Sequence, residues 1–599
     1  MRDKKNRDED RLTALRAAMK AHGVQGFLVP RADEFQGEFV APYAERLKWL
    51  TGFTGSAGLA LILEGRAAVL TDARYTLQIT RQIDTHLYEA LNIADITAGG
   101  WLADHAPEGA VIGYDPWLHT PAQLEKLEKE TAARGLVFTA LEHNLLDEIW
   151  SDQPALPKGQ VSIFPEEIAG LSSKNKRAQI GQTIEAEGGA CAIISLPDSL
   201  CWLLNVRGAD INYTPSVLSY GLIYAGDGVL QWFIDPDKLS PTVRAHLGEG
   251  VEIVDIADMP GALERAGRAA AQAGKPVFLD HDRTPVRFKR VLEKAGAHVQ
   301  NRKDPCIAPK AIKTLAEQQA VREAHIRDGV ALVRFLCWLE EAVPQGGLSE
   351  WTVAQKLYDF RADSPDFKEE SFSAIVGFGE NGAVVHYRAT ADHNALIAPP
   401  GLLLVDSGGQ YPDGTTDITR TVALGTPLQE MRKNFTRVLR GHIAVASARF
   451  KAGTIGADID TLARAPLREI GLDYAHGTGH GVGCYLAVHE EAASLSPRGH
   501  DPLEPGMLLS NEPGYYKEGA YGIRIENLVL VQEENSGLLG FETVSLAPID
   551  PALIVLAMLS AEELVWLNHY HAQVCEKLSP LLPEKERLWL VEKTRPLER

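Results

Sequence analysis

Apolar residues recur at helical spacing near the N-terminus of the chain. Leu12, Leu15 and Met19 fall on one face of the stretch 10–23, which ends at Gly23. Apolar positions three and four residues apart indicate an amphipathic helix, and glycine is a frequent residue at a helix C-terminus because it adopts positive φ without strain. The pattern therefore predicts a helix that stops at Gly23.

The last part of the chain carries further helical patterns. One predicted helix covers about 314–342, and Ser349 is a candidate cap for the helix that follows. Another covers 560–578, where Ser560 and Glu563 have the spacing of a capping box, in which the serine and glutamate side chains satisfy backbone N–H groups at the helix start. The chemically informative stretches lie between these helices.

The first half of the chain contains the same α/β pattern of predicted elements twice. Each copy has an apolar strand, a Trp-Leu step (at Trp49 and at Trp202) and then a hairpin of two apolar strands. Later, residues 111–121 and 277–285 both run strand, Asp, Thr-Pro and then a charged helix. Two unrelated α/β domains could share such a rhythm, but the order of matching features favours a duplication.

Two proline-rich breaks divide the chain. "QPALPKGQVSIFP" carries three prolines and "DPCIAP" carries two, with no helical period in either. A chain of 599 residues is too long for one hydrophobic core, so several domains are expected. The breaks predict domains at 1–158, 159–310 and 311–599.

Composition narrows the classes of partner. The net charge of −20 argues against binding to nucleic acid or to anionic lipid, because both are negatively charged. The six cysteines include no CxxC pair, which fits reduced thiols in a reducing compartment. The N-terminus shows no signal peptide and no apolar run is long enough to span a membrane. We therefore expect a cytoplasmic protein with no nucleic-acid and no membrane partner.

Four carboxylates occupy two matching strand–turn–strand patterns. In "GLLLVDSGGQYPDGTTDITRTV" Asp406 ends an apolar run and Asp417 lies on the returning arm. In "MLLSNEPGYYKEGAYGIRIENLVLVQ" Glu512 likewise follows an apolar run and Glu526 lies on the returning strand. Arg524 shares one face of that strand with Glu526. Like charges facing each other across a buried hairpin are costly unless a cation lies between them. The repeat predicts a metal site between two similar halves of one domain, with Arg524 in an ion pair that orients a carboxylate.

The stretch "AHGTGHGVG" (475–483) adds two histidines, His476 and His480, four residues apart. Zinc-binding helices use this spacing, but each glycine costs about 1 kcal/mol in a helix interior, so extended or looped backbone is predicted. One histidine can ligate a metal while the other stays free for substrate. Carboxylates with one imidazole are mostly hard oxygen donors, which suit divalent manganese, cobalt or zinc in a two-metal cluster.

Together, "VDSGGQYPDGTTDITRT", "HGTGHGVG", "NEPG" and "GIRIEN" strongly resemble the pita-bread metallopeptidases, which include methionine aminopeptidase, prolidase and aminopeptidase P. The resemblance implies five metal ligands: Asp406, Asp417, His480, Glu512 and Glu526. It also implies that Asp417 and Glu526 bridge the two metals, and that His480 is the ligand of the glycine-rich stretch. His476 would then lie in the substrate pocket.

The same resemblance places two further histidines at the site. They are His386 in "AVVHYRAT" and His489 in "AVHEE", each implied to bind substrate and to assist catalysis. Glu512 would move protons during attack of a metal-bridging hydroxide on the scissile carbonyl. The family usually has Glu-Gly-Pro after the second histidine, and "HEEAA" departs from that pattern.

Two creatinase-like modules, marked by "WLTGFTGSAG" and "WLLNVRGADINYTP", precede the catalytic part and resemble the three-domain aminopeptidase P branch. The implied fold is α/β (α+β), with two creatinase-like N-terminal modules followed by a pita-bread catalytic domain. The implied activity is release of the N-terminal residue from peptides with proline second, by a homodimer using two divalent ions, typically Mn²⁺, with Zn²⁺ or Co²⁺ as alternatives. The rival interpretations are a prolidase-like dipeptidase, a metal-free creatinase-type amidinohydrolase and a non-catalytic pita-bread binding protein.

Overall fold

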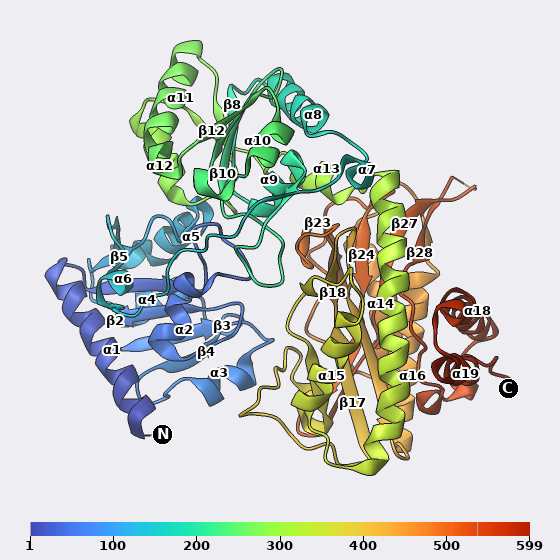
Figure 1. The fold of residues 1–599 in the computed structure, drawn as a ribbon. Helices are drawn as coiled ribbons and strands as arrows, with labels where there is room; N and C mark the ends of the chain where they lie inside the picture. Colours follow the sequence, from blue (N-terminus) through green and yellow to red (C-terminus); the bar gives the residue numbers. More distant parts are fainter. Residues whose placement is uncertain (1, 536) are drawn as a thin grey trace. The chain divides into compact units, whose positions relative to one another are not determined.

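The computed structural model describes residues 2–535 and 537–599, with the backbone alone described for residues 2–6. The chain forms two compact units: one runs up to Ile163 and includes Leu171–Ile307, and the other comprises Phe164–Gly170 and Ala308–Arg599. Figure 1 labels the elements of both. Among the described residues, no helix has both the length and the apolar character needed to cross a membrane.

The first unit contains two six-stranded sheets. The first has the order β4-β3-β2-β1-β5-β6. Its strands are β1 (Gly26–Pro30), β2 (Leu59–Leu63), β3 (Ala67–Thr71), β4 (Glu89–Asn92), β5 (Val111–Tyr114) and β6 (Val137–Ala140). Helix α1 (Arg2–Ala21) packs Leu12, Leu15 and Met19 into this sheet's core. The helix begins earlier than the pattern predicts, and Gly23 has the positive φ of +69° expected after a helix end.

The second sheet repeats the order of the first, as β12-β11-β10-β8-β13-β14. Its strands are β8 (Cys191–Ile194), β10 (Tyr220–Tyr224), β11 (Leu230–Phe233), β12 (Val251–Val254), β13 (Val277–Leu279) and β14 (Val299–Asn301). Parallel and antiparallel pairings also correspond strand by strand. The shared topology is what the repeated sequence plan predicts. The domain boundaries near 158 and 310 stay predictions.

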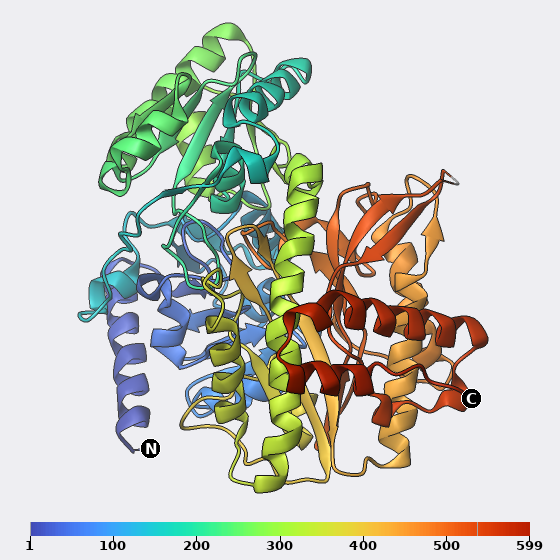
Figure 2. The same cartoon turned by 45° about the vertical axis from the view of Figure 1, so that its right-hand side comes forward.

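Long helices surround the sheets of the second unit. They are α14 (Leu315–Ala342), α15 (Glu350–Ala362), α16 (Gln429–Ala446), α17 (Gly456–Arg468), α18 (Ala561–Leu578) and α19 (Glu584–Lys593). Ser349 and Ser560 cap α15 and α18, as predicted; Ser560 does so in the predicted capping box, and Ser349 also forms one, with Thr352. The C-terminal helices α18 and α19 pack against α14 (Figure 2).

Two hairpins of the second unit have the same construction. Strand β17 (Gly401–Ser407) pairs with β20 (Ile418–Leu424), and the short strands β18 (Gly409–Tyr411) and β19 (Gly414–Thr415) lie between them in the chain. Strand β24 (Leu508–Asn511) pairs with β27 (Asn527–Glu533), with β25 (Gly514–Lys517) and β26 (Tyr521–Arg524) between them. These matching hairpins form the two halves that the repeated carboxylate pattern predicts.

The register corrects one detail of the sequence interpretation. Asp406 lies opposite Thr419 rather than Asp417, which stands just before β20. Likewise, Asn511 lies opposite Asn527, so Glu512 and Glu526 stand just beyond the last pair of that ladder. In each hairpin the inner strands continue the register of the outer strands, so the position of the turn determines which residues face each other.

Candidate metal centre

The five predicted ligands lie on strands of the second unit or directly beside them. His480 is the middle residue of β22 (Gly479–Gly481), which pairs with β23 (Glu490–Leu495) and β24, so the glycine-rich stretch is extended rather than helical, as predicted. A side chain on Gly479 would overlap the carbonyl oxygen of Ser510 on β24. Glycine is therefore needed here because two backbones approach closely. The Ser510 hydroxyl also accepts a hydrogen bond from the His480 N–H at 3.0 Å.

The ligand atoms of three of these residues converge. A carboxylate oxygen of Asp417, a carboxylate oxygen of Glu526 and a ring nitrogen of His480 all lie within 4.8 Å of one another. The His480 Nε2 atom is 3.6 Å from Asp417 Oδ2 and 3.5 Å from Glu512 Oε1. Glu512 keeps 18% of its side chain exposed, which leaves it accessible from outside the cluster.

Asp406 is tied to the same cluster through Thr419, which lies opposite it in the strand ladder. The Thr419 hydroxyl donates to Glu526 Oε2 at 2.7 Å. Arg524 donates to Asp406 Oδ2 at 2.6 Å and to the Thr419 hydroxyl at 3.2 Å. One threonine and one arginine therefore link the carboxylates of the two hairpins.

Several buried oxygen atoms of this cluster lack a donor. Among the described residues, none donates a hydrogen bond to Asp406 Oδ1, Asp417 Oδ1 or Glu526 Oε1. Buried polar atoms are almost always hydrogen-bonded, and leaving one unsatisfied costs roughly 1–3 kcal/mol. Three such oxygens beside one imidazole are the donor set that a divalent cation with a preference for oxygen would satisfy. The residues therefore fit a metal.

Ionisation of these side chains reflects their crowding in the metal-free protein. Burial, together with the charge of Asp417, raises the pKa of Asp406 to about 6 although Arg524 opposes the change. Burial raises the pKa of Glu512 to about 7, and burial with three neighbouring carboxylates holds that of Glu526 well above its ordinary value. Burial lowers the pKa of His480, but the hydrogen bond to Asp417 and nearby negative charge outweigh it and raise the pKa to about 9. The cluster retains protons that a cation would displace.

Arg524 continues the network away from the carboxylates. Its Nη1 donates to the Tyr516 hydroxyl at 2.6 Å, and its Nη2 donates to the Val385 carbonyl at 3.4 Å. Only 2% of the arginine side chain is exposed. The predicted ion pair therefore exists on Asp406, and it also anchors β25 and the loop that contains Val385.

The predicted substrate histidines lie at different distances from this cluster. His489 places its ring 4.4 Å from that of His480, nearly perpendicular to it. The Nε2 atom of His476 is 2.8 Å from the Tyr516 hydroxyl, which connects it to Arg524. His386 lies in the turn after the 3₁₀ helix Gly379–Ala383, next to the residue whose carbonyl Arg524 contacts.

Tyr516 and Thr419 make hydrogen bonds at the candidate site that the sequence did not predict. Tyr516 follows the "NEPG" motif on β25, and Thr419 lies two residues after Asp417. Their signal was weak, because a tyrosine in a hairpin and a threonine in a strand are both ordinary strand residues. Only the fold shows that their hydroxyls face the arginine and the carboxylates.

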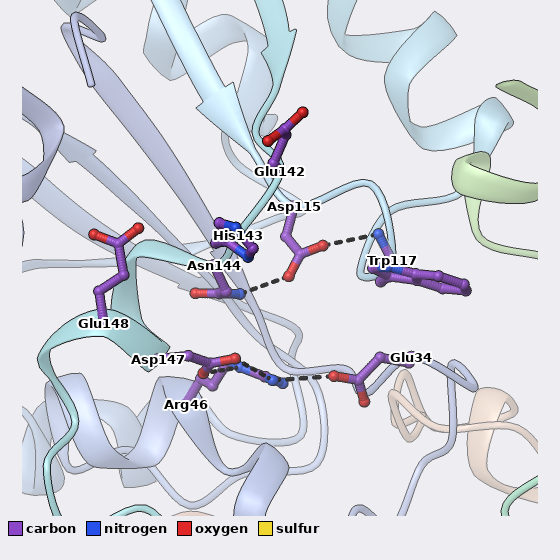
Figure 3. Close-up of a pocket in the computed structure, with 9 residues that line it drawn as sticks. All are labelled: Glu34, Arg46, Asp115, Trp117, Glu142, His143, Asn144, Asp147 and Glu148. Carbon is purple, nitrogen blue, oxygen red and sulfur yellow. Dashed lines mark hydrogen bonds and ion pairs between the residues drawn. The ribbon is translucent and has the colours of Figure 1, made fainter. Parts of the chain in front are cut away.

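A separate polar cavity of about 370 Å³ lies in the first unit and contains none of the predicted site residues (Figure 3). Arg46 donates hydrogen bonds to Asp147 at 2.7 Å and to Glu34 at 3.0 Å, so two of the carboxylates that line the cavity are paired with an arginine. Asp115 accepts from the Trp117 N–H and from Asn144, both at 2.9 Å. Glu34, Asp115 and Asp147 therefore each receive a hydrogen bond from a neighbour, in contrast to the unpaired oxygens of the second unit's carboxylates.

Family comparisons assign a class to each part of the chain. Residues 319–533 match metallopeptidase family M24, and residues 537–597 match the C-terminal region of that family. Residues 11–147 and 152–317 each match a creatinase/prolidase N-terminal domain. The fold and the site thus define a metallopeptidase with two creatinase-type domains before it, and the predicted fold class is confirmed.

Relatives that align with the chain over nearly its whole length indicate which M24 peptidases it belongs with. The probable Xaa-Pro aminopeptidase P of Aspergillus niger is 37% identical over 98% of this chain and 99% of its own length. That of Paracoccidioides brasiliensis (strain Pb03) is also 37% identical, with the same coverage. The crystal structure of X-prolyl aminopeptidase from Caenorhabditis elegans, described as a cytosolic enzyme with a di-nuclear active site, matches with a TM-score of 0.93 and 33% identity, over 98% of this chain and all of that one. The chain belongs to the Xaa-Pro aminopeptidases of metallopeptidase family M24, and it is a hydrolase.

Proposed function

We propose that this chain removes the N-terminal residue from peptides whose second residue is proline. The observation that carries the proposal is the cluster of four carboxylates and one imidazole, in which three buried oxygens have no donor among the described residues. The relatives named for this activity align with the chain over almost its whole length. The intact donor set argues against a binding protein without catalysis.

Five residues would hold two divalent ions: Asp406, Asp417, His480, Glu512 and Glu526. We assign the bridging positions to Asp417 and Glu526. Manganese is the ion we propose, because four of the five ligands are hard oxygen donors. When bound, such a pair supplies two functions: it lowers the pKa of a water molecule toward neutrality and it polarises the scissile carbonyl.

Glu512 has the properties of a residue that moves a proton. Its carboxylate lies in the cluster, 3.5 Å from His480 Nε2, and remains partly exposed. A carboxylate in this position would accept a proton from the attacking water and then deliver it to the proline nitrogen. That nitrogen needs a proton because it becomes the free amine of the leaving peptide.

The three remaining histidines would act on the peptide. We assign His386 and His489 to hydrogen bonds with the reacting carbonyl or the peptide backbone, and His476 to the substrate pocket. Arg524 keeps Asp406 oriented and holds Tyr516 beside His476. The proposed division of labour is therefore proton transfer by Glu512 and substrate placement by the histidines.

Three wider assignments accompany this function. We propose that the protein works as a homodimer in the cytoplasm and that its chain has three domains, 1–158, 159–310 and 311–599. The cytosolic description of the Caenorhabditis elegans enzyme supports the compartment. The repeated strand order of the first unit supports the two N-terminal domains.

A metal-dependence experiment tests the proposal. Chelator-treated full-length protein is assayed on Ala-Pro-Ala before and after addition of Mn²⁺, and bound metal is counted by mass spectrometry. We expect activity only after addition, with two ions per chain. Full activity in the chelated protein, or none after two ions have bound, would contradict the proposal.

A further inference from the structure

Glu350 is a fully buried carboxylate without a positively charged partner among the residues that the structure describes. It is the first residue of α15, directly after the capping Ser349, and 0% of it is exposed. A buried carboxylate is costly unless its oxygens receive hydrogen bonds. The residues that donate hydrogen bonds to Glu350 therefore show which part of the chain this carboxylate fixes in position.

Among the described residues, every hydrogen-bond donor to the Glu350 carboxylate comes from one segment, which runs from Phe378 to Ala395 and is called the loop below. Oε1 accepts from the Phe378 N–H at 2.8 Å and from Asn381 Nδ2 at 3.0 Å. Oε2 accepts from the Tyr387 hydroxyl and from the Ala395 N–H, both at 2.7 Å, and from Asn381 Nδ2 at 3.1 Å. Hydrogen bonds to an ionised acceptor are about twice as strong as neutral ones. One carboxylate thus fastens the beginning, the middle and the end of the loop.

The loop carries His386 one residue before the tyrosine that Glu350 holds. On its other side, the Val385 carbonyl accepts from Arg524, the arginine that contacts the carboxylate cluster. Gly382 of the same loop packs so closely on Gly522 of β26 that a side chain on Gly522 would overlap its carbonyl oxygen. The loop is therefore located between Glu350 and the strand that ends at Arg524.

We propose that Glu350 is a positioning residue for the peptidase reaction, acting through the loop to hold His386 at the site. The inference rests on the proposed role of His386 in binding the peptide. A loop without long regular structure loses much conformational entropy when it is fixed, so its position needs strong anchors. Displacement of a contacting group by about 1 Å can cost a hundredfold in rate.

Two substitutions weaken the anchor to different degrees. Tyr387→Phe removes one O–H donor, whereas Glu350→Gln replaces acceptor oxygens by an amide that cannot satisfy every donor. We expect kcat/KM on Ala-Pro-Ala to fall about tenfold in Tyr387→Phe and up to about a hundredfold in Glu350→Gln. Bound manganese should stay at the wild-type level in both variants, because neither residue belongs to the ligand set.

Asn394→Ala is the matched control from the same loop. Asn394 is partly exposed and its side chain donates to the carbonyls of Thr390 and Ala391, within the loop itself. This variant should keep the wild-type kcat/KM. A tenfold loss in Asn394→Ala would show that any change in the loop lowers activity, and would overturn a specific role for Glu350.

A double-mutant cycle with His386→Ala decides the mechanism, because coupled residues give non-additive effects. If Glu350 acts through His386, Tyr387→Phe changes kcat/KM less than about twofold in the His386→Ala background. An undiminished tenfold loss in that background would overturn the inference while leaving the role of His386 intact. Near wild-type activity of His386→Ala alone would instead remove the proposed role of His386, and the inference with it. Tyr387→Phe keeps the test valid even if Glu350→Gln does not fold.

Discussion

Replacing Glu512 by glutamine should stabilise the metal-free protein at alkaline pH, although it removes a metal ligand. Burial raises the pKa of Glu512 from 4.5 to about 7 in the folded protein. A carboxyl whose pKa is higher when folded binds more protons in the folded state, so its contribution to stability is full below about pH 4.5 and is lost as the pH rises through about 7. The glutamine cannot ionise and does not suffer this loss.

The structure gives the size of the effect. One pKa unit corresponds to about 1.4 kcal/mol, so the shift of Glu512 alone corresponds to roughly 3 kcal/mol at pH 8. The attraction between Glu512 and His480, whose ring nitrogen lies 3.5 Å from Oε1, is already contained in this pKa. We therefore expect metal-free Glu512→Gln to exceed the wild-type free energy of unfolding by about 3 kcal/mol at pH 8 and by almost nothing at pH 4.5.

Urea unfolding of chelator-treated protein at both pH values measures this difference, and the wild-type protein is the reference at each pH. Addition of Mn²⁺ should reverse the order at pH 8, because a ligand that binds only the folded state stabilises it and the glutamine variant binds the metal less tightly. A metal-free variant that is less stable than wild type at pH 8 would refute the electrostatic reasoning. So would an identical response of the two proteins to Mn²⁺.

The remaining predictions concern ligands and their supports. Asp417→Ala and Glu526→Ala should each lose both metal ions and all activity in a folded protein; two stoichiometric ions in either variant, counted by mass spectrometry, would remove the bridging assignment. His480→Ala should lose metal at one site, whereas His476→Ala should keep both ions and lose mainly turnover, and equal metal loss in the two variants would contradict this division of roles. Arg524→Lys keeps the charge but cannot reproduce the contacts of the planar guanidinium, so we expect kcat/KM to fall about ten- to a hundredfold with weaker metal binding in titrations. Wild-type kinetics in that variant would contradict the role given to the arginine network.

Periodicity and caps predicted the helices of the second unit well because both signals are local. Ser349 and Ser560 cap helices where the pattern placed them, and the glycine-rich stretch around His480 is extended as the helix penalty of glycine predicts. The first helix starts at Arg2, eight residues before the predicted start, because no cap or break marks its true beginning in the sequence.

Cross-strand register and side-chain networks could not be read from the sequence. Asp406 and Asp417 were expected to face each other, but one register runs through both the outer and the inner strand pairs of this hairpin, and it places Thr419 opposite Asp406. Tyr516 on β25 is hydrogen-bonded to Arg524 on β26 and to His476 of the glycine-rich stretch. The sequence pattern predicts the strands but not how they lie relative to that stretch. Such contacts between residues far apart in the chain require the fold itself.

The most direct test of the account compares two peptides that differ at one position. The manganese-loaded full-length protein is given Ala-Pro-Ala and Ala-Ala-Ala at equal concentration, and free alanine and the residual dipeptides are quantified by mass spectrometry. Glu512→Gln, prepared in the same way, is the control for a contaminating peptidase. The account predicts release of alanine from Ala-Pro-Ala with the dipeptide Pro-Ala as coproduct, little cleavage of Ala-Ala-Ala, and neither reaction in the variant. Equal cleavage of both peptides by the wild-type protein, or no cleavage of Ala-Pro-Ala, would contradict it.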